Sequence, residues 1–279
     1  MPACALPLTA PLHNLAAWTD CFRSAEIPVM AATAEALEAM RANEDAVDAN
    51  LLGEMIASDP LMTLKVLAHA GTRRSKRLTT ETETVTAALV MMGISPFFRA
   101  FRPQPTLDDR LSHIPEALEG LQNVLRRSHR AANFALGFAV RRMDHDAAVI
   151  HVATLLHDFA EMLLWCHAPA LALHIYREQH ADPTLRSSVI QERVLHIQLA
   201  DLQQSLMQAW CLPQMLMDIT NDRQAEHPSA KNVALAIRLA RHTTNGWDNA
   251  AIPDDVHDIG QLLNLSDAAS LELVQDLDT

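Results

Sequence analysis

Apolar residues recur at intervals of three and four along most of the chain, which is typical of helices with one buried face. The stretches 31–41 and 47–56 show this pattern, and Asp45 is the expected N-terminal cap of the second. Asp59-Pro60 precedes the next apolar stretch. Here the carboxylate can accept the open amide hydrogens of a new helix, while proline suits its first position. The pattern therefore predicts a series of short amphipathic helices.

A polar, proline-containing segment at 102–114 separates these helices from a second set. Pro115 begins a predicted helix that ends near residue 142, and another is expected over about 146–166. Further helices are expected at about 169–180, 187–194, 198–211, 213–221, 229–245, 253–263 and 267–277. The chain has only 7 glycines and 4% aromatic residues, a composition that disfavours sheets. The sequence therefore predicts an all-α fold of two packed helical subdomains.

The net charge of the chain argues against some classes of binding partner. The formal net charge is −12, which argues against binding nucleic acid through its phosphates and against binding an anionic membrane surface. No apolar run reaches the ~18 residues of a membrane span. The four cysteines form no C-x-x-C pair, and reduced thiols are expected. We therefore expect a cytoplasmic protein that binds a protein partner or a small molecule and uses no cofactor.

Two polar residues, His157 and Asp158, interrupt the most apolar predicted helix. Burying an imidazole and a carboxylate costs free energy unless each finds a partner. If His129 on the preceding helix lies near them, the three are a partial ligand set for Zn, Mn or Fe. A catalytic site needs at least three protein ligands and an open position for water. The alternative is a buried hydrogen-bonded pair that connects this helix to its neighbours.

The order and spacing of several segments resemble the HDOD domain, the HD-related output domain of bacterial signalling proteins. The HDOD domain is a relative of the HD superfamily of metal-dependent phosphohydrolases. The resemblance covers about 25–245 and implies a helical subdomain at 25–105 and a degenerate HD-like bundle at 112–245. Residues 246–279 are then a C-terminal helical extension packed on this domain. The segments that carry the resemblance are Ile27-Pro28, Ile56–Leu67, Ala87–Ile94, Leu155–Asp158 and Gln208–Pro213.

Two departures from the HD pattern bear on catalysis. HD hydrolases usually have a lysine three residues after the His-Asp doublet, and this chain has Glu161. The metal-binding aspartate of a later helix matches Arg241, whose positive charge would repel a metal ion. The resemblance thus implies vestigial metal ligands at His129, His157 and Asp158. We expect no catalytic residues, and a structural polar network of His157, Asp158 and Arg241.

The function that the resemblance implies is a non-catalytic module of bacterial signal transduction, which binds a protein partner or a small ligand. The alternative is an HD-type metal-dependent phosphohydrolase that acts on a nucleotide or a cyclic dinucleotide. A basic segment made of Arg73, Arg74, Lys76 and Arg77 is either a solvated turn or a site for an anion or an acidic partner. The sequence does not define the oligomeric state.

Overall fold

The structure is a computed structural model, and it describes residues 7–73, 82–182, 185–221 and 227–278. Within these ranges the chain contains helices and no strand, apart from an isolated bridge between Val29 and Thr106. The predicted all-α fold is confirmed. The chain divides into two compact units, residues 1–124 with 158–212, and residues 125–157 with 213–279. The division of the sequence expected near 102–114 stays a prediction.

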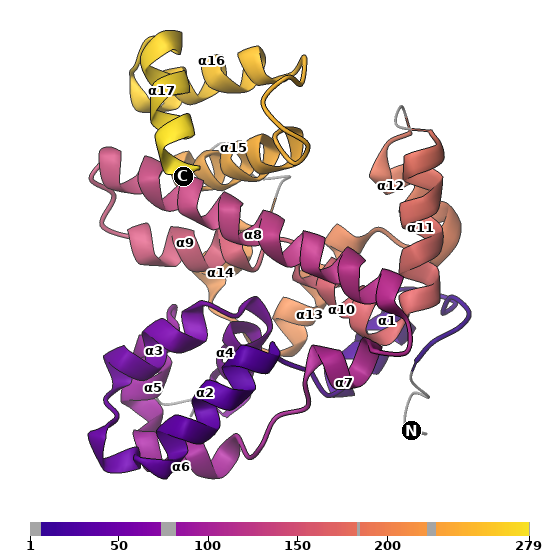
Figure 1. Cartoon of the computed structure of the whole chain (residues 1–279), viewed down its shortest axis with the longest axis vertical. Helices are drawn as coiled ribbons and strands as arrows, with labels where there is room; N and C mark the ends of the chain where they lie inside the picture. Colours follow the sequence, from indigo (N-terminus) through magenta and orange to yellow (C-terminus); the bar gives the residue numbers. More distant parts are fainter. Residues whose placement is uncertain (1–6, 74–81, 183–184, 222–226, 279) are drawn as a thin grey trace. The chain divides into compact units, whose positions relative to one another are not determined.

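The first unit contains the N-terminal helices and a later helical group (Figure 1). Its helices are α1 (Leu15–Ser24), α2 (Ala31–Ala42), η1 (Glu44–Ala46), α3 (Ala49–Ala57), α4 (Pro60–Arg73), α5 (Val85–Met92), α6 (Ile94–Ala100), α7 (Leu107–Leu111), α10 (Phe159–His167), α11 (Pro169–Ala181), α12 (Ser187–Leu195) and α13 (Leu199–Ala209). Helix α8 (Pro115–Arg141) begins in this unit and continues into the second. Trp18, Phe22, Phe97 and Phe159 are each fully buried and fill the core between these helices.

Helix starts in the first unit follow from local side-chain chemistry. Asp59 is fully buried, and its carboxylate accepts the amide hydrogens of Leu61 and Met62 at 2.9 and 3.1 Å, as the sequence predicts. The cap of α3 differs from the prediction. Asp45 lies in η1, and Asp48 caps α3 instead. The extra 3₁₀ turn delays the start of the helix by one turn, which apolar periodicity does not reveal.

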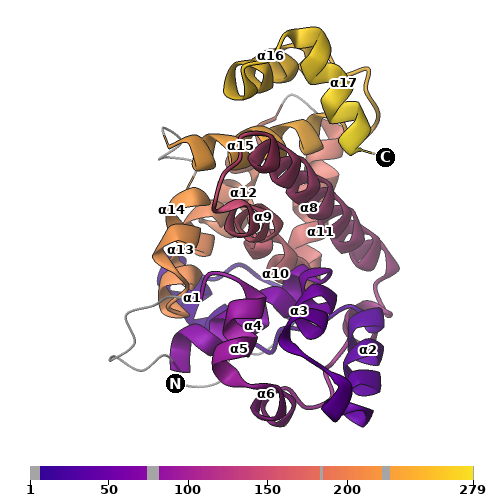
Figure 2. The same cartoon turned by 90° about the vertical axis from the view of Figure 1, so that its left-hand side faces the viewer.

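The second unit consists of the C-terminal part of α8 with α9 (Ala147–Leu155), α14 (Gln214–Ile219), α15 (Pro228–His242), α16 (Ile252–Leu263) and α17 (Asp267–Leu277). Figure 2 shows α15, α16 and α17 following one another as a helical group. Phe134 and Phe138 of α8 are fully buried. The guanidinium of Arg130 on α8 donates to both carboxylate oxygens of Asp278 at 2.8 and 2.7 Å, so the end of the described chain is fixed to α8.

The residues 147–167 form two helices, although the sequence predicts one over about 146–166. Helix α9 ends at Leu155 and α10 begins at Phe159. A window of 18 residues within this segment is apolar enough to cross a membrane, but 78% of that window is buried inside the protein. Its apolar character is accounted for by packing in the core. The break falls at His157 and Asp158, the residues that the sequence places inside a helix.

The cysteines differ partly from the expectation of reduced thiols. Cys21 is disulfide-bonded, whereas Cys166 and Cys211 are free. Spacing along a sequence does not reveal which distant thiols a fold brings together. Burial raises the pKa of the Cys166 thiol to about 12, so this cysteine is a hydrophobic core residue and not a nucleophile.

Candidate functional site

His157 and Asp158 lie in the turn between α9 and α10. The amide of His157 donates to the carbonyl of Thr154 at 3.1 Å, a tight contact of the 3₁₀ type. The carbonyl of Asp158 accepts the amide hydrogens of Glu161 and Met162, which begins α10. The side chain of Asp158 makes no capping hydrogen bond to that helix. Both residues are buried, with 7% and 9% of their surface exposed. Backbone bonds therefore hold the turn, and the two side chains are left for other contacts.

His129 lies on α8, the helix that the sequence predicts to carry the third candidate ligand. His129, His157 and Asp158 each have at least one interaction partner. A further histidine, His151 on α9, also belongs to this region. Burial lowers the pKa of His151, and the charge of His129 lowers it further. His129 and His151 therefore lie close enough to interact. The spacing of His151 from the other histidines along the sequence does not suggest a metal site.

A catalytic metal of the HD type would need three or more protein ligands in one place. Among the described residues, no group of three or more His, Cys, Asp or Glu side chains is arranged to hold a metal ion. Arg241, which the sequence resemblance compares with the distal aspartate, is an exposed residue in the last turn of α15. A cation is favourable at the C-terminal end of a helix. The contact of Arg241 with His157 and Asp158 stays a prediction.

The basic segment is only partly described. Arg73 is the last residue of α4 and is exposed, while Arg74, Lys76 and Arg77 lie outside the described residues. Burial lowers the pKa of the neighbouring His69, and the charge of Arg73 lowers it further. The predicted anion site at this segment stays a prediction.

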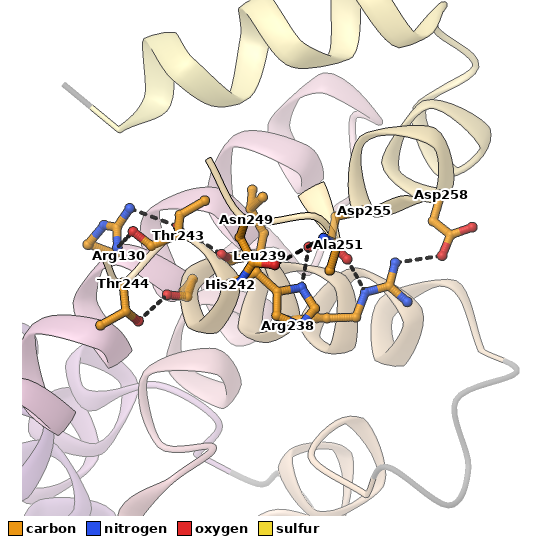
Figure 3. Close-up of polar contacts among 11 residues, drawn as sticks. Arg130, Arg238, Leu239, His242, Thr243, Thr244, Asn249, Ala251, Asp255 and Asp258 are labelled. Atoms are coloured by element: carbon orange, nitrogen blue, oxygen red, sulfur yellow. Dashed lines mark hydrogen bonds and ion pairs between the residues drawn. The ribbon is translucent and has the colours of Figure 1, made fainter. Parts of the chain in front are cut away.

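A polar network that the sequence does not indicate connects α15 to α16 (Figure 3). Asp255 is buried, with 2% of its side chain exposed, and its two oxygens lie 2.6 Å from Arg238 Nε and 2.6 Å from His242 Nδ1. Arg238 also pairs with Asp258, at 2.5 Å. In the sequence these residues look like ordinary surface charges of two amphipathic helices. Only the packing of α16 on α15 makes Asp255 a buried charge.

Removing the Asp255 carboxylate should weaken the attachment of α16 to α15. We expect Asp255→Ala to lower the free energy of unfolding by about 2 kcal/mol, because Arg238 and His242 lose a buried charged acceptor. Asp258→Ala is the matched control: Asp258 pairs with the same arginine but is 39% exposed, so its loss should cost little. Chemical denaturation and amide hydrogen exchange of α16 measure the effect. Equal losses in both variants would show that the buried position of Asp255 is unimportant.

His167, at the end of α10, is a buried titratable residue of the first unit. It is fully buried, and neither ring nitrogen has a hydrogen-bond partner among the described residues. Its ring packs edge-on against Phe22, with 5.4 Å between the ring centroids. Burial lowers the pKa of His167 to about 3, and the charge of Arg110 on α7 adds to this effect. His167 is therefore a neutral core residue at physiological pH.

His167 should make the protein sensitive to acid. The unfolded chain binds a proton at this residue below a pH of about 6.5, whereas the folded chain does so only near 3. Stability must therefore rise with pH across this window, and we expect a loss of about 2 kcal/mol between neutral pH and pH 5. His167→Phe should remove this loss, and His174→Gln, which changes an exposed histidine, should keep it. Urea denaturation at several pH values measures it. An unchanged pH dependence in His167→Phe would contradict the assignment.

The comparisons with known proteins agree with this all-helical architecture. A family model of the HDOD domain matches residues 27–226, well over half of the chain, and the chain therefore belongs to the HDOD family. Helices α15, α16 and α17, and with them Arg241, lie beyond the matched residues. Among curated proteins, none matches this chain in sequence.

Three solved structures share the fold at low sequence identity. The MmoQ response regulator from Methylococcus capsulatus has a TM-score of 0.67 at 17% identity, over 90% of this chain and 99% of that one. A virulence factor from Campylobacter jejuni has a TM-score of 0.65 at 14% identity, over 95% and 97% of the two chains. An HDOD domain protein of unknown function from Geobacter sulfurreducens has a TM-score of 0.50 at 14% identity, over 94% and 96%. At such identities the likeness concerns the fold alone.

Proposed function

We propose that this HDOD protein is a non-catalytic module of bacterial signal transduction, which acts in the cytoplasm by binding a protein partner or a small ligand. The observation that carries the proposal is the buried turn at His157 and Asp158, which belongs to no group of three possible metal ligands among the described residues. A hydrolase of the HD type needs such a group to activate water. Without such a group of ligands, the side chains of His157 and Asp158 contribute to structure. The protein then acts through a binding surface.

Family and charge support the same proposal. The chain shares its fold with a protein called a response regulator, and the resemblance to the HDOD domain implies a role in signalling. Its net charge of −12 disfavours nucleic acid and anionic membranes as partners. The signal would pass through contacts with another protein, or through a ligand that changes these contacts.

Metal content and partner capture test the proposal together. The full chain is purified without chelator or affinity metal, analysed for metals by mass spectrometry, and assayed against a panel of phosphodiesters. We expect substoichiometric metal and no turnover. The same chain, used as bait in an extract of its native cell, should retain a specific partner. A near-stoichiometric metal that is lost in His157→Ala, together with turnover, would instead establish the phosphohydrolase alternative.

A further inference from the structure

The connection between α15 and α16 contains the only Asn-Gly pair of the chain, Asn245-Gly246. The backbone nitrogen that follows an asparagine can attack the carbonyl carbon of its side chain, and such an intramolecular reaction has a high effective concentration. A side chain on the following residue hinders this approach, whereas glycine allows it. Asn245 is therefore the asparagine of this sequence that is best suited to the reaction.

The structure leaves the pair open to water and uncrowded. Asn245 and Gly246 are both exposed, and they follow the last turn of α15. Gly246 has a φ of 113°, a conformation that glycine adopts without strain. Within the described chain, no atom lies within 4 Å of the position that a β-carbon would occupy at Gly246. Exposed turns open locally at low cost, so the backbone can reach the angles that the attack requires.

One hydrogen bond restrains the attacking nitrogen. The amide of Gly246 donates to the carbonyl of Thr243 at 3.1 Å. This bond must open before the nitrogen can react, so the folded chain should react more slowly than an unfolded peptide of the same sequence. Because the turn is exposed, water can replace the Thr243 carbonyl, and the bond opens at a lower cost than in the core.

Asn249 in the same connection is an internal reference (Figure 3). It is exposed like Asn245, but alanine follows it in the sequence. Its side-chain oxygen accepts the amide hydrogen of Ala251 at 3.0 Å, which holds the carboxamide in place. A comparison of the two asparagines therefore measures what the following glycine and the local geometry contribute.

We propose that Asn245 is a site of spontaneous deamidation, and that the product loosens the attachment of α16 and α17. The nitrogen of Gly246 loses its proton to a base in the solvent and forms a bond to Cγ of Asn245. The bond between Cγ and Nδ2 breaks, and Nδ2 takes up a proton and leaves as ammonia. Water then opens the cyclic imide. Opening at Cγ gives aspartate, and opening at the backbone carbonyl carbon gives isoaspartate, which lengthens the main chain by a methylene group.

The product lies beside contacts that fix the C-terminal helices. The carbonyl of Thr243 that holds Gly246 also accepts a hydrogen bond from Arg130 at 3.3 Å, and the Thr243 hydroxyl accepts another at 2.9 Å. Arg130 in turn donates to Asp278, directly after α17. A longer main chain at residue 245 displaces the amide of Gly246 from Thr243. The new carboxylate also follows the C-terminal end of α15, where a negative charge is unfavourable.

Ageing of the purified full chain tests the site. The protein is kept in mildly alkaline buffer for weeks, digested and analysed by mass spectrometry, and fresh protein is digested in parallel to correct for conversion during digestion. We expect Asn245 to convert about tenfold faster than Asn249. The variant Asn245→Gln would have to close a larger ring and should stay unconverted at this position. If Asn245 converts no faster than Asn249, or does not convert at all, the proposal is overturned.

Amide hydrogen exchange tests the consequence of the reaction. We expect α16 to exchange about tenfold faster in converted protein than in Asn245→Gln of the same age. Asn245→Asp adds the charge without the methylene group and should show a smaller increase. Asn249→Asp places the same charge farther from α15 and should show none. Equal exchange in converted protein and in aged Asn245→Gln would show that deamidation leaves the C-terminal helices in place. This inference is independent of the proposed function.

Discussion

Replacing Asp59 by alanine should lower the free energy of unfolding by about 4 kcal/mol. The carboxylate of Asp59 is fully buried and accepts three backbone amide hydrogens, from Leu61, Met62 and Met30, the last at 2.8 Å. Two of these bonds begin α4, and the third holds the segment that leads into α2. Alanine would leave all three donors without this acceptor, and the amides of Leu61 and Met62 lie in the core, where water replaces it poorly.

The chain contains a matched control for this experiment. Asp48 caps α3 in the same way, by accepting the amide hydrogens of Asn50 and Leu51, but it is exposed. Water can reach the freed amides there, so Asp48→Ala should cost only about 1 kcal/mol. Denaturation by urea, followed by circular dichroism, measures both variants. Equal losses would mean that the third bond and the burial of Asp59 contribute nothing.

Asp158→Ala should cost about 3 kcal/mol, the second largest loss that we expect. Asp158 lies in the buried turn between α9 and α10 and has an interaction partner. Removing a buried carboxylate leaves that partner uncompensated, which is the main part of the cost. Under the proposed function, the variant should lose stability while its metal content stays unchanged.

Asp146, just before α9, is the control for Asp158. It is also an aspartate at the start of a helix, and its side chain makes no capping hydrogen bond, but it is exposed. Asp146→Ala should therefore be nearly neutral. Thermal melting compares the two variants, and mass spectrometry compares their metal content. If Asp158→Ala melts with the wild type, the structural role of Asp158 is wrong. If it loses a bound metal instead, the hydrolase alternative gains support.

The features that the sequence predicts correctly are those set by near neighbours in the chain. Asp59-Pro60 begins α4 as expected. Pro115 begins α8 and Pro169 begins α11, where the sequence predicts new helices. Each of these depends on a few residues whose preferences act within one helical turn. The family resemblance, too, follows from the order of such local segments.

The sequence by itself therefore determined the helical class, most of the helix boundaries and the membership of the HDOD family. Only the tertiary structure decided the break at His157 and Asp158, where the apolar pattern resumes directly after the two polar residues but tight backbone bonds end α9. It also decided that Asp255 is buried while Asp258 is exposed, although both lie on α16. The physical reason is that burial, charge partners and helix register arise from contacts between distant segments, which local propensities do not encode.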